Sequence, residues 1–149
     1  MSKRWGEPTW YFFHVFAEKI VNDFYIKNKN EVDELIFSIC ANLPCPYCKE
    51  HAVNYLKKNK LIFVKNKEQL KMYFFNFHND VNKSKKQKIF NIDILKKYEH
   101  VSIVNAYKFF CQEFFRTVYL SKHFSGWIRN SIRDKTQKFM IANVCHFSP

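Results

Sequence analysis

Two cysteines, Cys45 and Cys48, form the most reactive pattern in the chain, with Pro46 and Tyr47 between them. A C-x-x-C pair can cycle between dithiol and disulfide with little strain. Proline in second place suits the first turn of a helix. At a helix N-terminus, unpaired backbone N–H groups and the positive end of the helix dipole favour a thiolate over a thiol. The pattern therefore predicts a redox-active dithiol.

Three kinds of protein could carry this pair. The first is a thiol oxidase, and the second is a thioredoxin-like protein, which needs a strand just before the motif. Residues 31–41 have helical spacing instead. The third is a zinc site made of Cys45, Cys48, His51 and a fourth ligand, although strong zinc motifs repeat the pair and this chain has no second C-x-x-C. The patterns favour redox chemistry over zinc, and a chance pair is a further alternative.

A second motif follows thirty residues after Cys48 and reads His-Asn-Asp-Val-Asn, from His78 to Asn82. On a helix, positions 78, 81 and 82 share one face. An imidazole and amides on one face suit a planar heteroaromatic cofactor. Trp10 and His14, four residues apart, also share a helical face. Taken singly, each of these residues fits an ordinary core or a polar stripe equally well.

Taken together, these motifs resemble the Erv/ALR family of FAD-dependent sulfhydryl oxidases. The family pattern W-G-x-x-x-W-x-x-x-H is matched by Trp5, Gly6, Trp10 and His14. The segment Leu43–Ala52, around the dithiol, also looks like the short oxidases of large cytoplasmic DNA viruses. The resemblance covers Trp5 to about Phe90, with three motifs in family order.

The resemblance implies an all-α four-helix bundle with an additional short helix, holding FAD and forming a homodimer. It implies that Cys45 faces the substrate and that Cys48 lies beside the flavin. The family usually has lysine at the position of Gln87, so we expect Lys86 or Lys88 to meet the cofactor phosphates. The expected cofactor-binding residues are Gly6, Trp10, His14, His78, Asn79, Val81, Asn82, Lys86 and Lys88.

The implied reaction is the oxidation of a protein dithiol, such as that of a thioredoxin-like or viral redox protein. Electrons pass through the Cys45–Cys48 pair and flavin to oxygen, and hydrogen peroxide forms. We expect no metal. The alternative from a different functional class is a binding module, not an enzyme. It would be a basic all-helical protein with a zinc-bound C-x-x-C that binds nucleic acid or protein.

The composition of the chain agrees with a helical globule. Hydrophobic residues make up 47% of its 149 residues, and there are only 2 glycines and 4 prolines, too few turn formers for many short strands. The net charge of +12 predicts no more than non-specific attraction to nucleic acid, because no nucleic-acid-binding motif is present. There is no run of eighteen apolar residues that would predict a membrane span. The N-terminus does not look like a signal peptide, so we expect a cytoplasmic protein, in a host cell or virion if viral.

The helical periodicity predicts a first helix from Pro8 to about Val21 and further helices over 31–42, 46–59, 67–83 and 92–119. Residues 61–64 suit a short strand or an extended loop. We expect an oxidase domain over 1–120 and a basic tail or accessory helix over 121–149. Of the remaining cysteines, Cys40 and Cys111 are expected to be buried. Cys145 is expected to be mobile, with an exposure that is incidental and serves no relay of electrons.

Overall fold

The computed structural model describes residues 4–120 and 126–149 and is all-α over these residues, as predicted. The bounds of the α-helices are α1 Gly6–Lys19, α2 Asn22–Lys27, α3 Lys29–Cys40, α4 Pro46–Lys58, α5 Lys67–Ser84, α6 Ile103–Leu120 and α7 Gly126–Asn143. Short 3-10 helices are η1 Leu61–Phe63, η2 Ile92–His100 and η3 Val144–His146.

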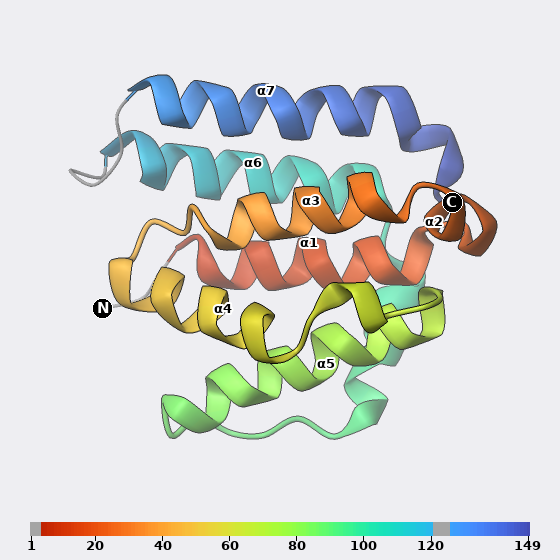
Figure 1. The fold of residues 1–149 in the computed structure, drawn as a ribbon, viewed down its shortest axis with the longest axis horizontal. Helices are drawn as coiled ribbons and strands as arrows, with labels where there is room; N and C mark the ends of the chain where they lie inside the picture. The colour runs from red at the N-terminus through yellow and green to blue at the C-terminus, as the bar shows by residue number, and fades with distance from the viewer. Residues whose placement is uncertain (1–3, 121–125) are drawn as a thin grey trace.

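Helix α1 lies at the centre, with α6 and η2 packed against it as well as α5 (Figure 1). It is apolar around most of its circumference, which is the pattern of a buried helix. Phe12 stacks on Phe110 of α6 with ring centroids 4.9 Å apart, and Phe13 stacks on Phe74 of α5 at 4.8 Å. These offset aromatic contacts join three helices into one core.

Four predicted helices are confirmed to within about two residues, namely α1, α3, α4 and α5. Local signals explain their starts. Asn66 accepts a hydrogen bond from Gln69 N–H at the start of α5, and Pro46 occupies the first turn of α4. Helix α2 was not predicted, and residues 61–63 form a 3-10 turn in place of a strand or extended loop.

The prediction of one continuous helix over 92–119 was wrong. Val101 is extended, and Ser102 Oγ accepts a hydrogen bond from Val104 N–H, which starts α6 as a separate helix. The break allows η2 to fold back against α1, so that the ring of Tyr98 stacks on His14 with centroids 4.8 Å apart.

The C-terminal segment is helical and packs closely, which contradicts the predicted mobility of Cys145. Helix α7 lies along α6 and α3 (Figure 1) and buries Ile132, Thr136, Phe139 and Met140. Beyond it, Phe147 is buried and pairs with Ile20 in an antiparallel bridge. The backbone N–H of Val21 donates to His146 O at 2.8 Å. The predicted division at residues 120 and 121 adjoins 121–125, outside the described residues, and stays a prediction.

Candidate active site

The dithiol lies where α4 begins, as the proline predicted. Cys45 is the N-cap residue, and its Sγ accepts a hydrogen bond from the backbone N–H of Cys48 at 3.3 Å. Cys48 is buried, whereas Cys45 is half-buried and Tyr47 between them is 63% exposed. The first cysteine of the pair is thus the more accessible one, and the second points inward. Both thiols experience the positive end of the α4 dipole.

Cys48, but not Cys45, lines a cavity of about 670 Å³. This volume is in the range of about 300–1,000 Å³ that is typical of cofactor sites. Segments from the start of α1 to η2 supply the walls, which include aromatic side chains from several of them. The lining residues that matter for the site are Gly6 and Trp10 of α1, Cys48 of α4, Phe77, His78, Val81 and Asn82 of α5, Lys85, Gln87 and Phe90 of the following loop, and Lys97 and Tyr98 of η2.

One wall is an aromatic and imidazole stack. The rings of Trp10 and His78 are nearly parallel, with centroids 4.3 Å apart and an interplanar angle of 7°. His78 Nδ1 shares a hydrogen bond of 2.9 Å with His14 Nε2, and His14 stacks in turn on Tyr98. His14 does not line the cavity itself, but its hydrogen bond holds the ring of His78 in the cavity wall.

Both imidazoles are neutral near pH 7. Burial lowers the pKa of His14 to about 3, with further lowering by the neighbouring His78 and Lys97. The pKa of His78 is lowered to about 4, chiefly by burial and then by the charges of Lys97 and Lys85. In the neutral pair one ring donates and the other accepts, so each fixes the tautomer of the other.

Near the cavity, two buried polar atoms lack a hydrogen-bond partner among the described residues. They are Asn82 Nδ2 and His14 Nδ1. A buried donor without a partner costs about 1–3 kcal/mol, so such an atom in a cavity wall is a natural contact for a ligand acceptor. Asn82 lines the cavity, and its Nδ2 therefore offers a hydrogen bond to whatever the cavity binds.

Asn79 has a structural contact instead of a place in the cavity wall. Its Nδ2 donates to Phe90 O at 3.0 Å, and its Oδ1 accepts from Phe90 N–H at 2.9 Å. This pair of bonds clamps the loop after α5 onto the helix. It brings the Phe90 ring against His78, with centroids 5.1 Å apart. Asn79 thus acts on the cavity through Phe90.

The lysines at the cavity differ from the expected ones. Lys85 and Lys97 line the cavity, whereas Lys86 and Lys88 do not. Lys86 has a φ of 56°, the left-handed conformation of the turn that ends α5. Gln87, at the position where the family pattern has lysine, does line the cavity. Lys97 could not be identified from the sequence, because it lies fifteen residues beyond the second motif (97 against 82) and depends on how η2 folds back.

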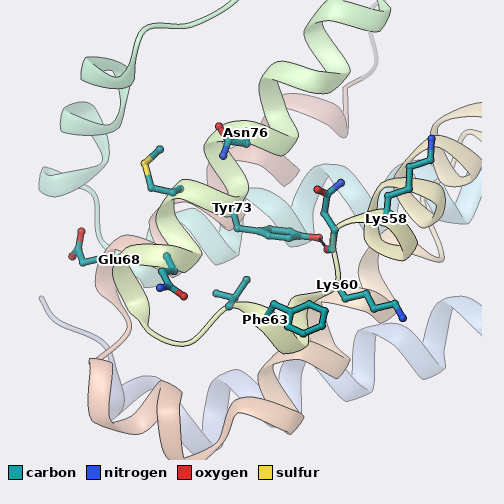
Figure 2. A pocket seen from close by; sticks show the side chains of 10 residues that line it. Lys58, Lys60, Phe63, Glu68, Tyr73 and Asn76 are labelled. Carbon is teal, nitrogen blue, oxygen red and sulfur yellow. Dashed lines mark hydrogen bonds between the residues drawn. The ribbon is translucent and has the colours of Figure 1, made fainter.

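A separate hollow of about 590 Å³ lies between η1 and the first half of α5 (Figure 2). Lys58, Phe63 and Tyr73 are among the residues that line it, and Tyr73 Oη donates to Asn59 O at 2.7 Å. None of its lining residues lines the cavity beside Cys48. This hollow is therefore distinct from the candidate active site.

Cys40 is buried, as predicted, and burial raises the pKa of its thiol to about 12. Cys111 is half-buried, and Cys145 is exposed. His51 Nε2 lies 2.8 Å from Asp80 Oδ2.

In the described part of the chain, no group of three or more His, Cys, Asp or Glu side chains is arranged to hold a metal ion. Among the helices of the same residues, none has the length and apolar character needed to cross a membrane.

The model of the Erv1/Alr family matches residues 7–102, which is more than half of the chain. The chain belongs to this family. A relative named FAD-linked sulfhydryl oxidase, from African swine fever virus, is 33% identical over 105 residues, covering 70% of this chain and 87% of the relative. A putative FAD-linked sulfhydryl oxidase of Invertebrate iridescent virus 3 is 35% identical over 81 residues, covering 54% of this chain and 55% of that protein. A probable FAD-linked sulfhydryl oxidase of Fowlpox virus is 23% identical over 77 residues, covering 52% of this chain and 77% of that protein.

Proposed function

We propose that this protein is an FAD-linked thiol oxidase that forms disulfide bonds in substrate dithiols and passes the electrons to oxygen. The observation that carries the proposal is the position of Cys48. It lies in the wall of the same cavity that Trp10, His78 and Asn82 line. An inward-facing redox cysteine beside an aromatic cavity is the arrangement that a flavin-linked thiol oxidase requires. The family membership and the names of the viral relatives support the same activity.

The residues of the cavity fit FAD. Trp10 and His78 present flat aromatic surface to aromatic rings, and Asn82 Nδ2 is a buried donor with no partner within residues 4–120 and 126–149. The charges of Lys85 and Lys97 suit the diphosphate. Gly6 and Val81 complete the walls, while His14 and Asn79 act through His78 and Phe90. Lys85 and Lys97 therefore replace Lys86 and Lys88 as our candidates for phosphate contacts.

When bound, FAD supplies a two-electron acceptor that oxygen can reoxidise, with hydrogen peroxide as the product. The chain's own residues carry out the thiol exchange. A substrate thiolate attacks Cys45 Sγ, the more accessible sulfur of the Cys45–Cys48 disulfide. The bond between the two sulfurs breaks, and its electron pair remains on Cys48 Sγ, inside the cavity. The α4 N-terminus stabilises the thiolate formed there.

The second substrate thiol then attacks the mixed disulfide and releases Cys45, so the substrate leaves as a disulfide. We infer that the physiological substrate is a protein dithiol, such as that of a thioredoxin-like or viral redox protein, which can approach the exposed Tyr47 side of the pair. A homodimer and a place in host cytoplasm or a virion are proposals that rest on the family resemblance and the viral relatives.

The test begins with the purified protein. We expect a yellow protein whose released cofactor is FAD by chromatography, and oxygen consumption with dithiothreitol that yields hydrogen peroxide. Gel filtration coupled to light scattering measures the molecular mass in solution and so tests whether the protein is a dimer. A colourless preparation that also fails to bind added FAD would overturn the proposed function.

A further inference from the structure

His51, which the sequence offered only as a candidate zinc ligand, lies beside the dithiol on α4. It follows Cys48 by three residues on α4, and both side chains line the cavity. Helical residues at this spacing are neighbours, with Cβ atoms roughly 5–6 Å apart. A charge on the imidazole would therefore act strongly on the Cys48 thiol.

Two side chains of helix α5 contact the imidazole of His51. Asp80 Oδ2 lies 2.8 Å from His51 Nε2, and Ser84 Oγ lies 3.5 Å from Nδ1. The Ser84 hydroxyl donates its own hydrogen to Val81 O at 2.8 Å, so its lone pairs are what it can offer to Nδ1. A doubly protonated His51 thus has an acceptor near each of its N–H groups.

His51 also separates two spaces. An outer groove of about 410 Å³, lined by Glu50, Asn54 and Asp80, shares only His51 and Tyr47 with the cavity beside Cys48. The imidazole therefore lies at the boundary between the buried cysteine and the surface, where a proton can pass between them. Besides Cys48, His51 and Asp80, the titratable or charged residues that line the two spaces are Glu7, Tyr11, Cys40, Tyr47, Glu50, Tyr55, Lys58, His78, Lys85, Lys97 and Tyr98.

We propose that His51, held by Asp80, accepts the proton of the incoming substrate thiol and then stabilises the Cys48 thiolate as an imidazolium. This proposal rests on the proposed thiol oxidase function. The substrate thiol gives its proton to His51, its sulfur bonds to Cys45 Sγ, and the Cys45–Cys48 bond breaks. The electron pair of that bond remains on Cys48 Sγ, which faces the imidazolium. Asp80 is a positioning residue that acts through His51.

The test measures the ionisation of Cys48 in the purified holoprotein, without turnover. Cys45→Ser leaves Cys48 as the only cysteine of the pair, and mass spectrometry follows its alkylation by iodoacetamide from about pH 5 to 9. We compare His51→Gln, Asp80→Asn and Glu50→Gln in this background. Glu50→Gln is the matched control, because it removes an exposed carboxylate of the same groove that has no hydrogen bond to His51.

We expect His51→Gln and Asp80→Asn each to slow alkylation near pH 7 by about threefold or more, because the thiolate loses its imidazolium. The direction for Asp80→Asn is diagnostic. Removal of a negative charge by itself favours a thiolate, so a loss of thiolate can arise only through His51. Glu50→Gln should not slow alkylation, and His51→Lys, which restores a positive charge, should recover most of the rate.

Unchanged or faster alkylation in both His51→Gln and Asp80→Asn would overturn the proposal. Circular dichroism of each variant checks its fold, and His51→Lys keeps the proposal testable if His51→Gln is unstable. Flavin content is measured on the same samples. Absence of flavin would count against the proposed function, whereas the alkylation result bears on His51 alone.

Discussion

The indole of Trp10 and the imidazole of His78 lie in parallel planes, with centroids 4.3 Å apart, although 68 residues separate them in the chain (78 − 10). The stack joins α1 to α5 at the wall of the cavity beside Cys48. Offset stacking of this kind contributes about 0.5–1.5 kcal/mol beyond the burial of the two rings. The stack gives this wall flat surfaces with a fixed direction.

Replacement of His78 and Asn82 together by alanine should reduce the affinity for FAD. Asn82 Nδ2 is buried and has no partner in the part of the chain that the structure describes. Loss of a hydrogen bond from it costs about 1–3 kcal/mol, or roughly 5- to 150-fold in Kd. Quenching of flavin fluorescence on titration with apoprotein measures the Kd. Asn76→Ala is the control, because Asn76 is exposed on the same helix. Full flavin occupancy in the doubly substituted protein would contradict the assigned pocket.

Cys48→Ser should retain bound FAD but lose its reduction by dithiothreitol. The reason is that Cys48 is the only cysteine of the dithiol that lines the cavity. Anaerobic bleaching of the flavin absorbance and oxygen uptake measure the effect, with Cys111→Ser as a control that keeps the dithiol intact. Oxygen uptake at the normal rate in Cys48→Ser would rule out the role of this cysteine.

Lys85→Ala and Lys97→Ala should weaken FAD binding about two- to tenfold each, while binding of riboflavin, which lacks the diphosphate, stays nearly unchanged. Both lysines line the cavity, and a charge-assisted contact to phosphate is lost. The loss should diminish at high salt because ions screen exposed charges. Lys96→Ala is the matched control, since Lys96 lies next to Lys97 but is paired with Asp93 at 3.3 Å. Equal effects on FAD and riboflavin would show that these lysines do not contact the phosphates.

The free energy of unfolding should decrease as the pH falls from about 6.5 towards 4. The folded state lowers the pKa of His14 to about 3 and that of His78 to about 4, against 6.5 for an ordinary histidine. The unfolded chain therefore binds protons that the folded chain does not, with a slope of up to about 1.4 kcal/mol per pH unit for each histidine. Urea unfolding at several pH values measures the slope. His14→Gln should flatten the slope.

Cys145→Ser should oxidise dithiothreitol at nearly the normal rate and a reduced thioredoxin-like protein with at most a modest loss. Cys145 is exposed, but it lies in η3, and the next residues are bound to α1. The backbone N–H of Ser148 donates to Lys19 O at 2.6 Å, and Lys19 Nζ donates to Pro149 O at 2.9 Å. A tethered single cysteine is a poor electron shuttle. A large loss confined to the protein substrate would make Cys145 a relay.

Much of the site followed from local patterns in the sequence. Pro46 after Cys45 predicts a helix that begins at the dithiol, and spacings of three and four place positions 78, 81 and 82 on one face. These signals depend on residues within one or two helical turns of each other. They can therefore be identified without any long-range contact.

The tertiary structure decided which side chains from distant segments of the chain meet. The break at Val101 brings Lys97 and Tyr98 to the cavity, the bonds between Asn79 and Phe90 fold the loop after α5, and Asp80 meets His51 across two helices. Helix α7 looked polar, because its apolar positions are sparse, but they pack on α3 and α6 once those helices are in place. Burial, and with it the lowered pKa of His14 and His78, belongs to the packed molecule, because desolvation requires neighbours that the local sequence does not specify.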